Sequence, residues 1–348
     1  MTLETRRYRR PAAVAAGAGL IALSAFFATA QSNVASVVNT TFTKYQNLHE
    51  GKNADYIPAL AKVDPNLFGI ALITSDGKVY TAGDVKTEVS IQSISKVFTM
   101  ARVIEDSGPQ SIEKRIGVDA TGMRFNSIIS VELAKKVGGG PELNPLVNPG
   151  AITATSMVQG KTADEVWGKI IGTYSDFAGR QLSINQEVYK SESDSNQRNA
   201  AIASLMYAFG RIQAEPKQTT DLYTRQYSVN VNAKDLATMA STLANGGKNP
   251  ITGKQLLTAD EVAQILAIMA TAGLYDDSGR WLFATGLPAK SGAAGGLIAV
   301  SPGKFGIAAI SPPLDKGGNS VRAQKAITDI SKALRGNPYR IEAAPTAN

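Results

Sequence analysis

The order of apolar segments along the chain is the feature that most constrains its fold. The stretch "LFGIALITSDGKVYTAGD" near the start predicts two apolar strands joined by a turn at Asp76-Gly77. Near the end, "GLIAVSPGKFGIAAIS" predicts a second strand pair about Pro302-Gly303. The long segment between them has the spacing of helices. Strands at both ends of a helical middle predict one antiparallel sheet assembled from the two ends of the chain.

The helical middle begins with an apolar pattern from Ser95 to Ser107 that stops at Gly108-Pro109, a common end signal. Further helices are predicted in "ADEVWGKIIGTYSDFAG", "QRNAAIASLMYAFGRIQ", "NAKDLATMASTLANGG" and "TADEVAQILAIMATAG", because several begin after Thr, Asn or Asp and end at Gly. A first helix is predicted over residues 36–48, and an amphipathic helix in "NSVRAQKAITDISKAL" closes the fold.

Together these segments predict an α/β (α+β) fold with two lobes. The sheet lobe takes about residues 31–92 and 276–335, and the inserted helical lobe takes about residues 93–275. A cleft between two such lobes is where a small ligand binds.

The first thirty residues predict a signal peptide rather than part of the fold. An arginine-rich start precedes the apolar run "AAVAAGAGLIALSAFFATA", which ends in the cleavage pattern Ala28-Thr29-Ala30. We therefore expect residues 1–30 to be removed, the mature domain 31–348 to be periplasmic or secreted, and no stable membrane association afterwards. The run is also long enough to span a bilayer, so an uncleaved anchor is the alternative.

The inventory of reactive side chains excludes several classes of site. The chain has no cysteine and one histidine, His49, so it lacks thiol nucleophiles, thiolate zinc sites and multi-histidine metal sites. Little is left to hold a catalytic transition metal, and a hydrolytic base would have to be lysine, tyrosine or a carboxylate. The four arginines of the leader, less Glu4, account for +3 of the formal +7. The remaining basicity is modest and shows no cluster interleaved with aromatics, which gives no case for nucleic acid.

The stretch "SIQSISKVFTM", residues 90–100, holds the candidate nucleophile. Residues three apart share a helix face, so Ser93 faces Lys96 and Ser95 does not. A lysine whose pKa is lowered by burial can deprotonate the serine, which then forms an acyl-enzyme with an amide. The helix N-terminus that follows favours the developing anion.

Three other Ser-x-x-Lys pairs lack this setting, because only Ser93 joins a strand to an apolar helix; they are Ser75/Lys78, Ser111/Lys114 and Ser301/Lys304. A second element supports Ser93. Lys290-Ser291-Gly292 stands just before a predicted strand of the C-terminal sheet, and serine enzymes with Ser-x-x-Lys often carry Lys-Thr/Ser-Gly on a strand of the same cleft.

Seven stretches together resemble the serine-dependent glutaminases of β-lactamase-like fold: "SIQSISKVFTM", "PLVNPGAI", "SESDSNQRNAAIA", "DLYTRQYSVNV", "TAGLYDDSGRW", "LPAKSGAAGG" and "ISPPLDKGGNSVRAQK". They occur in order, and the match as a whole runs from about Asp55 to Leu334. The resemblance implies the β-lactamase/D,D-peptidase-like architecture and hydrolysis of L-glutamine to L-glutamate and ammonia. It also implies that no metal or organic cofactor is needed and that the enzyme is a homo-oligomer, dimer or tetramer.

The resemblance also implies a role for each site residue. Ser93 corresponds to the nucleophile, Lys96 to its base and Tyr275 to a proton shuttle. The backbone N–H groups of Ser93 and Ala293 correspond to the oxyanion hole. The α-amino and α-carboxylate groups of glutamine would be held by Tyr56, Asn148, Glu192, Asn199 and Tyr223. Two positions depart from the family pattern: Ala293 stands where valine is frequent, and Pro149 where alanine is more usual.

Two other functions stay open at this point. A penicillin-interacting enzyme, a β-lactamase or D,D-peptidase, also uses Ser-x-x-Lys, but it should carry a Ser-Asp-Asn-like element, to which "YSVNV" is only distantly similar. A secreted module that binds an amino acid without hydrolysing it would not need an intact Ser93/Lys96 pair.

Overall fold

The computed structural model describes residues 33–136 and 143–341. The predicted signal peptide, residues 1–30, lies outside the described residues. Within the described ranges, no helix has both the length and the apolar character that crossing a membrane requires.

The sheet is antiparallel and joins the two ends of the chain, as the sequence predicts. Its strands, in the spatial order β2-β1-β7-β6-β5, are β2 (Val79–Gly83), β1 (Gly69–Thr74), β7 (Phe305–Ile310), β6 (Gly296–Ser301) and β5 (Ala289–Ser291). The central pairing of β1 with β7 places Ala71 opposite Ala308. Both predicted hairpin turns are present, and their glycines, Gly77 and Gly303, have the positive φ angles of 84° and 73° that such turns need.

The two faces of the sheet are covered by different helices, because side chains alternate between the faces of a strand. On one face, Ile70, Leu72 and Leu297 pack with Val38 of a helix over residues 33–45, with Trp281 of α13 and with Ile327 of α14. The helix α13 covers Ser278–Thr285, and α14 covers Val321–Ala333. This first helix ends at residue 45, three residues before the predicted end at residue 48. No glycine or proline marks its end before Gly51, so the sequence carries no local stop signal there.

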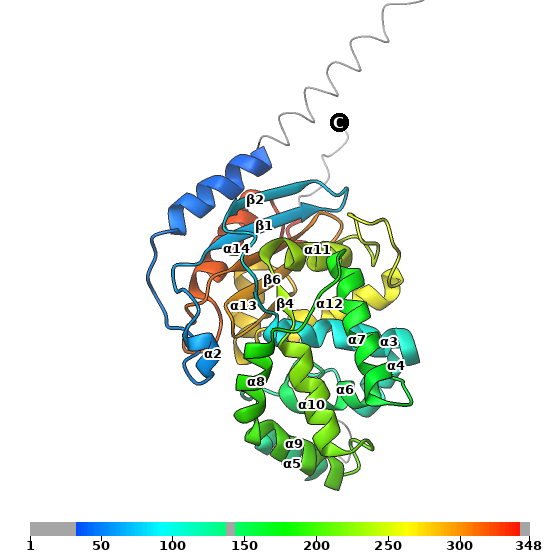
Figure 1. Cartoon of the computed structure of the whole chain (residues 1–348). Coiled ribbons are helices and arrows are strands. Elements are labelled where there is room, and N and C mark those ends of the chain that lie inside the picture. Colours follow the sequence, from blue (N-terminus) through cyan, green and yellow to red (C-terminus); the bar gives the residue numbers. More distant parts are fainter. Residues whose placement is uncertain (1–32, 137–142, 342–348) are drawn as a thin grey trace, which may run out of the picture.

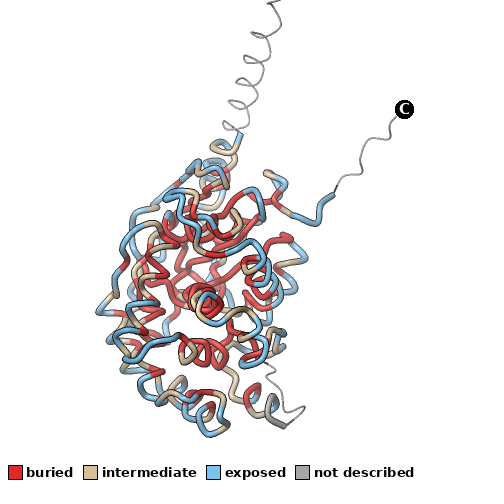
Figure 2. Tube along the Cα trace, turned by 90° about the vertical axis from the view of Figure 1, so that its right-hand side faces the viewer, coloured by how far each residue is buried: buried red, intermediate tan, exposed pale blue. Residues whose placement is uncertain are grey.

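The other face packs against α11 (Ala233–Ala244), which lies along the sheet in Figure 1. This approach is so close that a Cβ on Gly306 of β7 would overlap the backbone of Ser241. Behind α11 lies the mostly helical part of the molecule, and Figure 2 shows buried residues running through the middle of the fold. Its central helix is α3 (Ser95–Ser107), whose first seven residues are all buried and whose bounds match the predicted segment.

The remaining described helices lie beside α3 or further from it, where they pack against one another. They are α2 (Pro58–Ala61), α4 (Gln110–Arg115), α5 (Ile128–Lys136), α6 (Asn148–Met157), α7 (Ala163–Ala178), α8 (Gln186–Asp194), α9 (Gln197–Ala208), α10 (Pro216–Tyr227) and α12 (Ala259–Ala272), with the short 3-10 helices η1 (Gln92–Ile94) and η2 (Tyr275–Asp277). The predicted start signals act as caps: Thr162 accepts a hydrogen bond from Glu165, and Asn232 and Thr258 form capping boxes. The fold is the mixed α/β arrangement that the sequence predicts, while the boundaries of the two lobes stay a prediction.

Candidate active site

Ser93 lies where a short strand turns into the central helix. The strand β3 (Val89–Ser90) pairs with β4 (Asn230–Val231), and the Ile91 N–H continues the pairing by donating to the Val229 carbonyl at 2.8 Å. At the next residue, Gln92, the backbone has φ +52°. A left-handed angle outside glycine costs about 1–3 kcal/mol and persists only where surrounding contacts fix it. This strained turn presents Ser93 to the solvent side while α3 runs back into the core.

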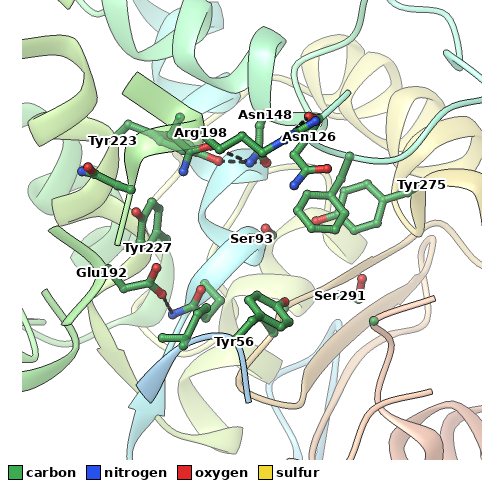
Figure 3. Close-up of a pocket in the computed structure, with 18 of the residues that line it drawn as sticks. Tyr56, Ser93, Asn126, Asn148, Glu192, Arg198, Tyr223, Tyr227, Tyr275 and Ser291 are labelled. Carbon is green, nitrogen blue, oxygen red and sulfur yellow. Dashed lines mark hydrogen bonds between the residues drawn. The ribbon is translucent and has the colours of Figure 1, made fainter. Parts of the chain in front are cut away.

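Ser93 lines a cavity of about 260 Å³. The residues that the sequence assigns to the site also line it, with the exception of Lys96: Tyr56, Asn148, Glu192, Asn199, Tyr223, Tyr275 and Ala293. Figure 3 shows Ser93 near the centre, with Glu192 and Tyr275 on opposite sides of it. The fold therefore brings together residues that are far apart in the chain.

Lys96 lies directly beneath the cavity. It is 2% exposed, and its Nζ donates to Asn148 Oδ1 at 2.7 Å. Burial without a carboxylate partner penalises the charged form and lowers the pKa of Lys96 to about 7. A substantial fraction of this lysine is therefore neutral near pH 7, as a proton acceptor must be.

A second lysine, Lys290, flanks the same region from β5. It is 0% exposed, its Nζ donates to the Ser291 carbonyl at 2.9 Å, and the same atom lies 4.1 Å from the centroid of the Tyr275 ring. Burial, followed by the nearby charge of Lys96, holds the pKa of Lys290 well below its usual range. The prediction put the Lys290-Ser291-Gly292 motif just before a strand. The motif does precede the strand β6, and Lys290 and Ser291 themselves also form the short edge strand β5, which the sequence did not predict.

Tyr275 lies close to both lysines and to Ser93. Its ring centroid is 5.4 Å from Lys96 Nζ, and its ring packs at 5.2 Å against Phe125. Burial raises the pKa of Tyr275, and a hydrogen bond with Ser93 acts in the opposite direction. The phenol is therefore protonated and in contact with Ser93, so it is placed to pass a proton to or from that hydroxyl.

The opposite side of the cavity holds a buried acid. Glu192 of α8 is 8% exposed, and burial raises its pKa to about 7, opposed by the hydrogen bond that Gln92 Nε2 donates to Glu192 Oε1 at 3.0 Å. The same Gln92 nitrogen also donates to Ser90 Oγ at 2.9 Å. A carboxylate that burial discourages from ionising gains most from a cation brought to it.

A chain of amides and a phenol lies between the acid and Lys96. Asn148 Nδ2 donates to Asn199 Oδ1 at 2.9 Å, and the Tyr223 hydroxyl donates to Asn148 Oδ1 at 3.2 Å. Tyr56 stands at the mouth and is 61% exposed. Pro149 falls within the first turn of α6, where proline fits, so its presence leaves Asn148 lining the cavity.

Neither Asn199 nor Glu192 serves as a helix cap. The helix α9 begins after Asn196, not at Asn199, and has no side-chain cap. Glu192 lies inside α8.

Of the other Ser-x-x-Lys pairs, Ser75/Lys78 and Ser301/Lys304 lie in neighbouring sheet turns, where the Ser75 N–H donates to the Lys304 carbonyl at 2.9 Å. Among the described residues, no group of three or more His, Cys, Asp or Glu side chains is arranged to hold a metal ion.

Sequence reasoning missed several residues that line the cavity, chiefly Gln92, Asn126 and Arg198. Gln92 lies inside the "SIQSISK" stretch, but neither its left-handed backbone nor its bond to Glu192 has a local signal. Arg198 adjoins the assigned Asn199, and its Nε donates to the Asn126 carbonyl at 2.9 Å. This contact brings a cation to the rim, close to Asn148 and Asn126 in Figure 3.

Comparison with known proteins identifies the family. The family model described as Glutaminase matches residues 51–339. A glutaminase of Colwellia psychrerythraea is 51% identical over 309 residues, which cover 89% of this chain and 98% of that protein. A glutaminase of Mycobacterium ulcerans is 50% identical over 292 residues, or 84% of this chain and 90% of that protein.

Solved structures agree with these relatives. The probable glutaminase ybaS superposes with a TM-score of 0.86 at 45% identity, covering 89% of this chain and 99% of that chain. A structure titled Mglu in its glutamate form has a TM-score of 0.83 at 33% identity, covering 88% of this chain and 70% of that chain. With matches of this extent in sequence and in fold, the chain belongs to the glutaminase family and has its β-lactamase-like fold.

Proposed function

We propose that the chain hydrolyses L-glutamine to L-glutamate and ammonia through an acyl-enzyme on Ser93. The observation that carries the proposal is the buried Lys96, with a pKa of about 7, one helical turn after a serine that lines the cavity. Membership of the glutaminase family supports the reaction. The serine mechanism and the individual roles rest on the chemistry of these side chains.

In the proposed acylation, neutral Lys96 takes the proton of Ser93, and Ser93 Oγ attacks the carboxamide carbon of glutamine. The oxyanion that forms accepts hydrogen bonds from the N–H groups of Ser93 and Ala293. Tyr275 passes its proton to the amide nitrogen and takes a replacement from the Lys96 ammonium, the C–N bond breaks, and ammonia leaves. Water then attacks the carbonyl carbon of the ester, gives up a proton to Lys96, and forms an oxyanion that is held by the same two N–H groups. Glutamate departs, and the proton returns to Ser93.

Recognition of the amino-acid end falls to the opposite side of the cavity. The substrate ammonium would face Glu192 and restore its ionised state, and the substrate carboxylate would accept hydrogen bonds from Asn148, Asn199 and Tyr223. Tyr56 would cover the mouth. A neighbour in fold was solved in its glutamate form, which supports a cavity of this kind holding the product.

A coupled glutamate-release assay on purified residues 31–348 tests the proposal, with Ser93→Ala as the matched variant. We expect the wild type to release glutamate and ammonia in equal amounts and the variant to release almost none. Nitrocefin hydrolysis without glutamine turnover would instead support a penicillin-interacting enzyme. Binding of glutamine without ammonia release would support the non-enzymatic module.

We also propose that the protein is exported and that it forms a dimer or tetramer. The arginine-rich start and the Ala28-Thr29-Ala30 ending support export, with cleavage after Ala30. Mass spectrometry of the exported protein should find Gln31 at the N-terminus, and an intact Met1 on membrane-bound material would contradict cleavage.

Light scattering on the mature protein tests the proposed dimer or tetramer. A protein that stays monomeric at all concentrations would exclude both.

A further inference from the structure

The turn that carries Tyr275 is strained. Tyr275 opens η2 with φ +57°, a left-handed angle that is rare for a bulky side chain. Such a conformation costs about 1–3 kcal/mol and persists only where neighbouring groups fix it. The position of the phenol at Ser93 therefore depends on whatever holds this turn.

Part of the restraint comes from the turn itself. Ser278 is 2% exposed, and its hydroxyl accepts from the Leu274 N–H at 3.0 Å and donates to the Tyr275 carbonyl at 2.8 Å. The Asp277 N–H also donates to the Leu274 carbonyl at 3.0 Å. These bonds close the turn, but they do not fix where it stands relative to the cavity.

A loop of the C-terminal segment supplies that fixed point. Asn319 is 0% exposed, and its Nδ2 donates to Asp277 Oδ2 at 3.3 Å. A Cβ built on Gly317 would overlap the same carboxylate oxygen, so the Asp277 side chain lies flat against the loop backbone. The loop is itself braced, because Asp315 Oδ1 accepts from the N–H groups of Gly317 at 2.9 Å and Asn319 at 3.0 Å.

The same loop forms part of the cavity wall. Gly317 and Gly318 line the cavity, whereas Asp277 does not. Asp277 therefore connects the turn of Tyr275 to the wall without reaching the place where a substrate would lie. We name Asp277, Gly317 and Asn319 the Asp277 contact.

We propose that Asp277 is a positioning residue, which holds the Tyr275 phenol at Ser93 through its contact with Gly317 and Asn319. This role rests on the proposed function, because it acts through the proton transfer assigned to Tyr275. Displacing the Asp277 carboxylate tilts η2 and moves the phenol, while the groups that face the amino-acid end of the substrate stay in place. The proposal therefore predicts a loss in kcat with little change in KM.

Gly317→Ala is the sharpest probe. Gly317 has a φ outside the left-handed region, so alanine adds no backbone strain and acts through the overlap with Asp277. We expect kcat to fall about 10- to 100-fold, the cost typical of a catalytic group misplaced by about 1 Å. Asp277→Ala should lower kcat similarly, and Asp277→Asn should retain most of it because it keeps the shape and an acceptor oxygen.

The double variant Gly317→Ala with Asp277→Ala tests whether Gly317→Ala lowers kcat by displacing Asp277. Without the carboxylate the added methyl group no longer overlaps any atom and meets only Asn319 Nδ2 at 3.1 Å and Asp315 Oδ1 at 3.3 Å, so the double variant should be little slower than Asp277→Ala alone. Gly279→Ala is the matched control, since it is an equal change two residues from Asp277 with no atom within 4 Å of the added Cβ, and it should behave as wild type. Circular dichroism checks that each variant is folded. If Gly317→Ala does not fold, Asn319→Ala replaces it in the same cycle.

Three results would overturn the positioning role on an active wild type. These are losses that multiply in the double variant, a raised KM with unchanged kcat, or full activity of Asp277→Ala. A wild type that releases no glutamate, or an active Ser93→Ala, would instead reject the proposed function and the positioning role with it. The two failures are thus told apart by the wild type and Ser93→Ala.

Discussion

Burial shifts pKa values in opposite directions on the two sides of the cavity. The floor, defined as Ser93, Lys96, Tyr275 and Lys290, holds two buried lysines whose pKa values are lowered. The wall, defined as Tyr56, Glu192, Asn199 and Tyr223, holds a buried carboxyl whose pKa is raised to about 7. In each case removal from water favours the neutral form. On the floor this yields a proton acceptor, and on the wall it yields a group that becomes charged when a cation arrives.

The comparison suggests a division of work between the two sides. The contacts of Lys96 and Lys290 are with an amide oxygen, a carbonyl and an aromatic ring rather than with substrate-facing acids. Changes on the floor should therefore affect kcat. Changes on the wall should affect KM, because in the proposed binding mode its groups face the part of the substrate that does not react.

The largest effect is expected for Ser93→Ala. Removing a nucleophile from a serine enzyme costs about 10⁶-fold in kcat, and the loss here should be several orders of magnitude. A reactive glutamine analogue such as 6-diazo-5-oxo-norleucine should label the peptide that contains Ser93 in wild type and fail to label it in the variant. Ordinary turnover by Ser93→Ala would show that the nucleophile is not Ser93.

Lys96→Met should come next. Methionine keeps the apolar stem within the core and removes the amine, so the fold should survive while kcat falls by orders of magnitude, as for Ser93→Ala. Steady-state kinetics and circular dichroism together check this. A folded variant with nearly normal kcat would show that another group serves as the base.

Glu192→Gln tests whether the wall acts in substrate binding. Losing the charge that faces the substrate ammonium removes a charge-assisted hydrogen bond of about 1.5–3 kcal/mol, so KM should rise roughly 10- to 100-fold. The variant should keep the fold and most of kcat, because glutamine can still accept the bond from Gln92. Unchanged KM would exclude Glu192 from binding.

The pH dependence of kcat/KM tests both sides at once. The active free enzyme needs neutral Lys96 and ionised Glu192, and both pKa values are about 7. Lowering the pH protonates both groups, so kcat/KM should fall below pH 7 with a slope steeper than one group gives. In Glu192→Gln the slope should drop towards that of a single group. A wild-type profile that stays flat from pH 8 to pH 6 would contradict both ionisations.

The smallest effect is expected for Ser95→Ala. Ser95 is buried, and its hydroxyl donates to the Gln92 carbonyl at 2.6 Å instead of reaching the cavity. Its loss removes one local bond worth about 1 kcal/mol, so kcat should stay within about tenfold of wild type. Labelling of Ser95 by the glutamine analogue would show that the wrong serine has been assigned.

Features that depend on neighbours in sequence were predicted well. The hairpin turns at Gly77 and Gly303 and the bounds of α3 agree with the structure, because turn residues and helix stop signals act over a few positions. The candidate nucleophile also has a local signal, the spacing of Ser93 and Lys96. The remaining site residues were found through resemblance to a family, since no local pattern links residues so far apart.

The tertiary structure alone decided the electrostatics of the site and its strained turns. The burial of Lys96 and Glu192, the stacking of Lys290 on Tyr275, and the contact of Asp277 with Gly317 all join distant segments. The sequence determined which groups are present and which elements carry them. Their pKa values and positions depend on the solvent that the folded chain excludes and on groups brought close only by packing, which is why the sequence could name a candidate nucleophile but not the environment that surrounds it.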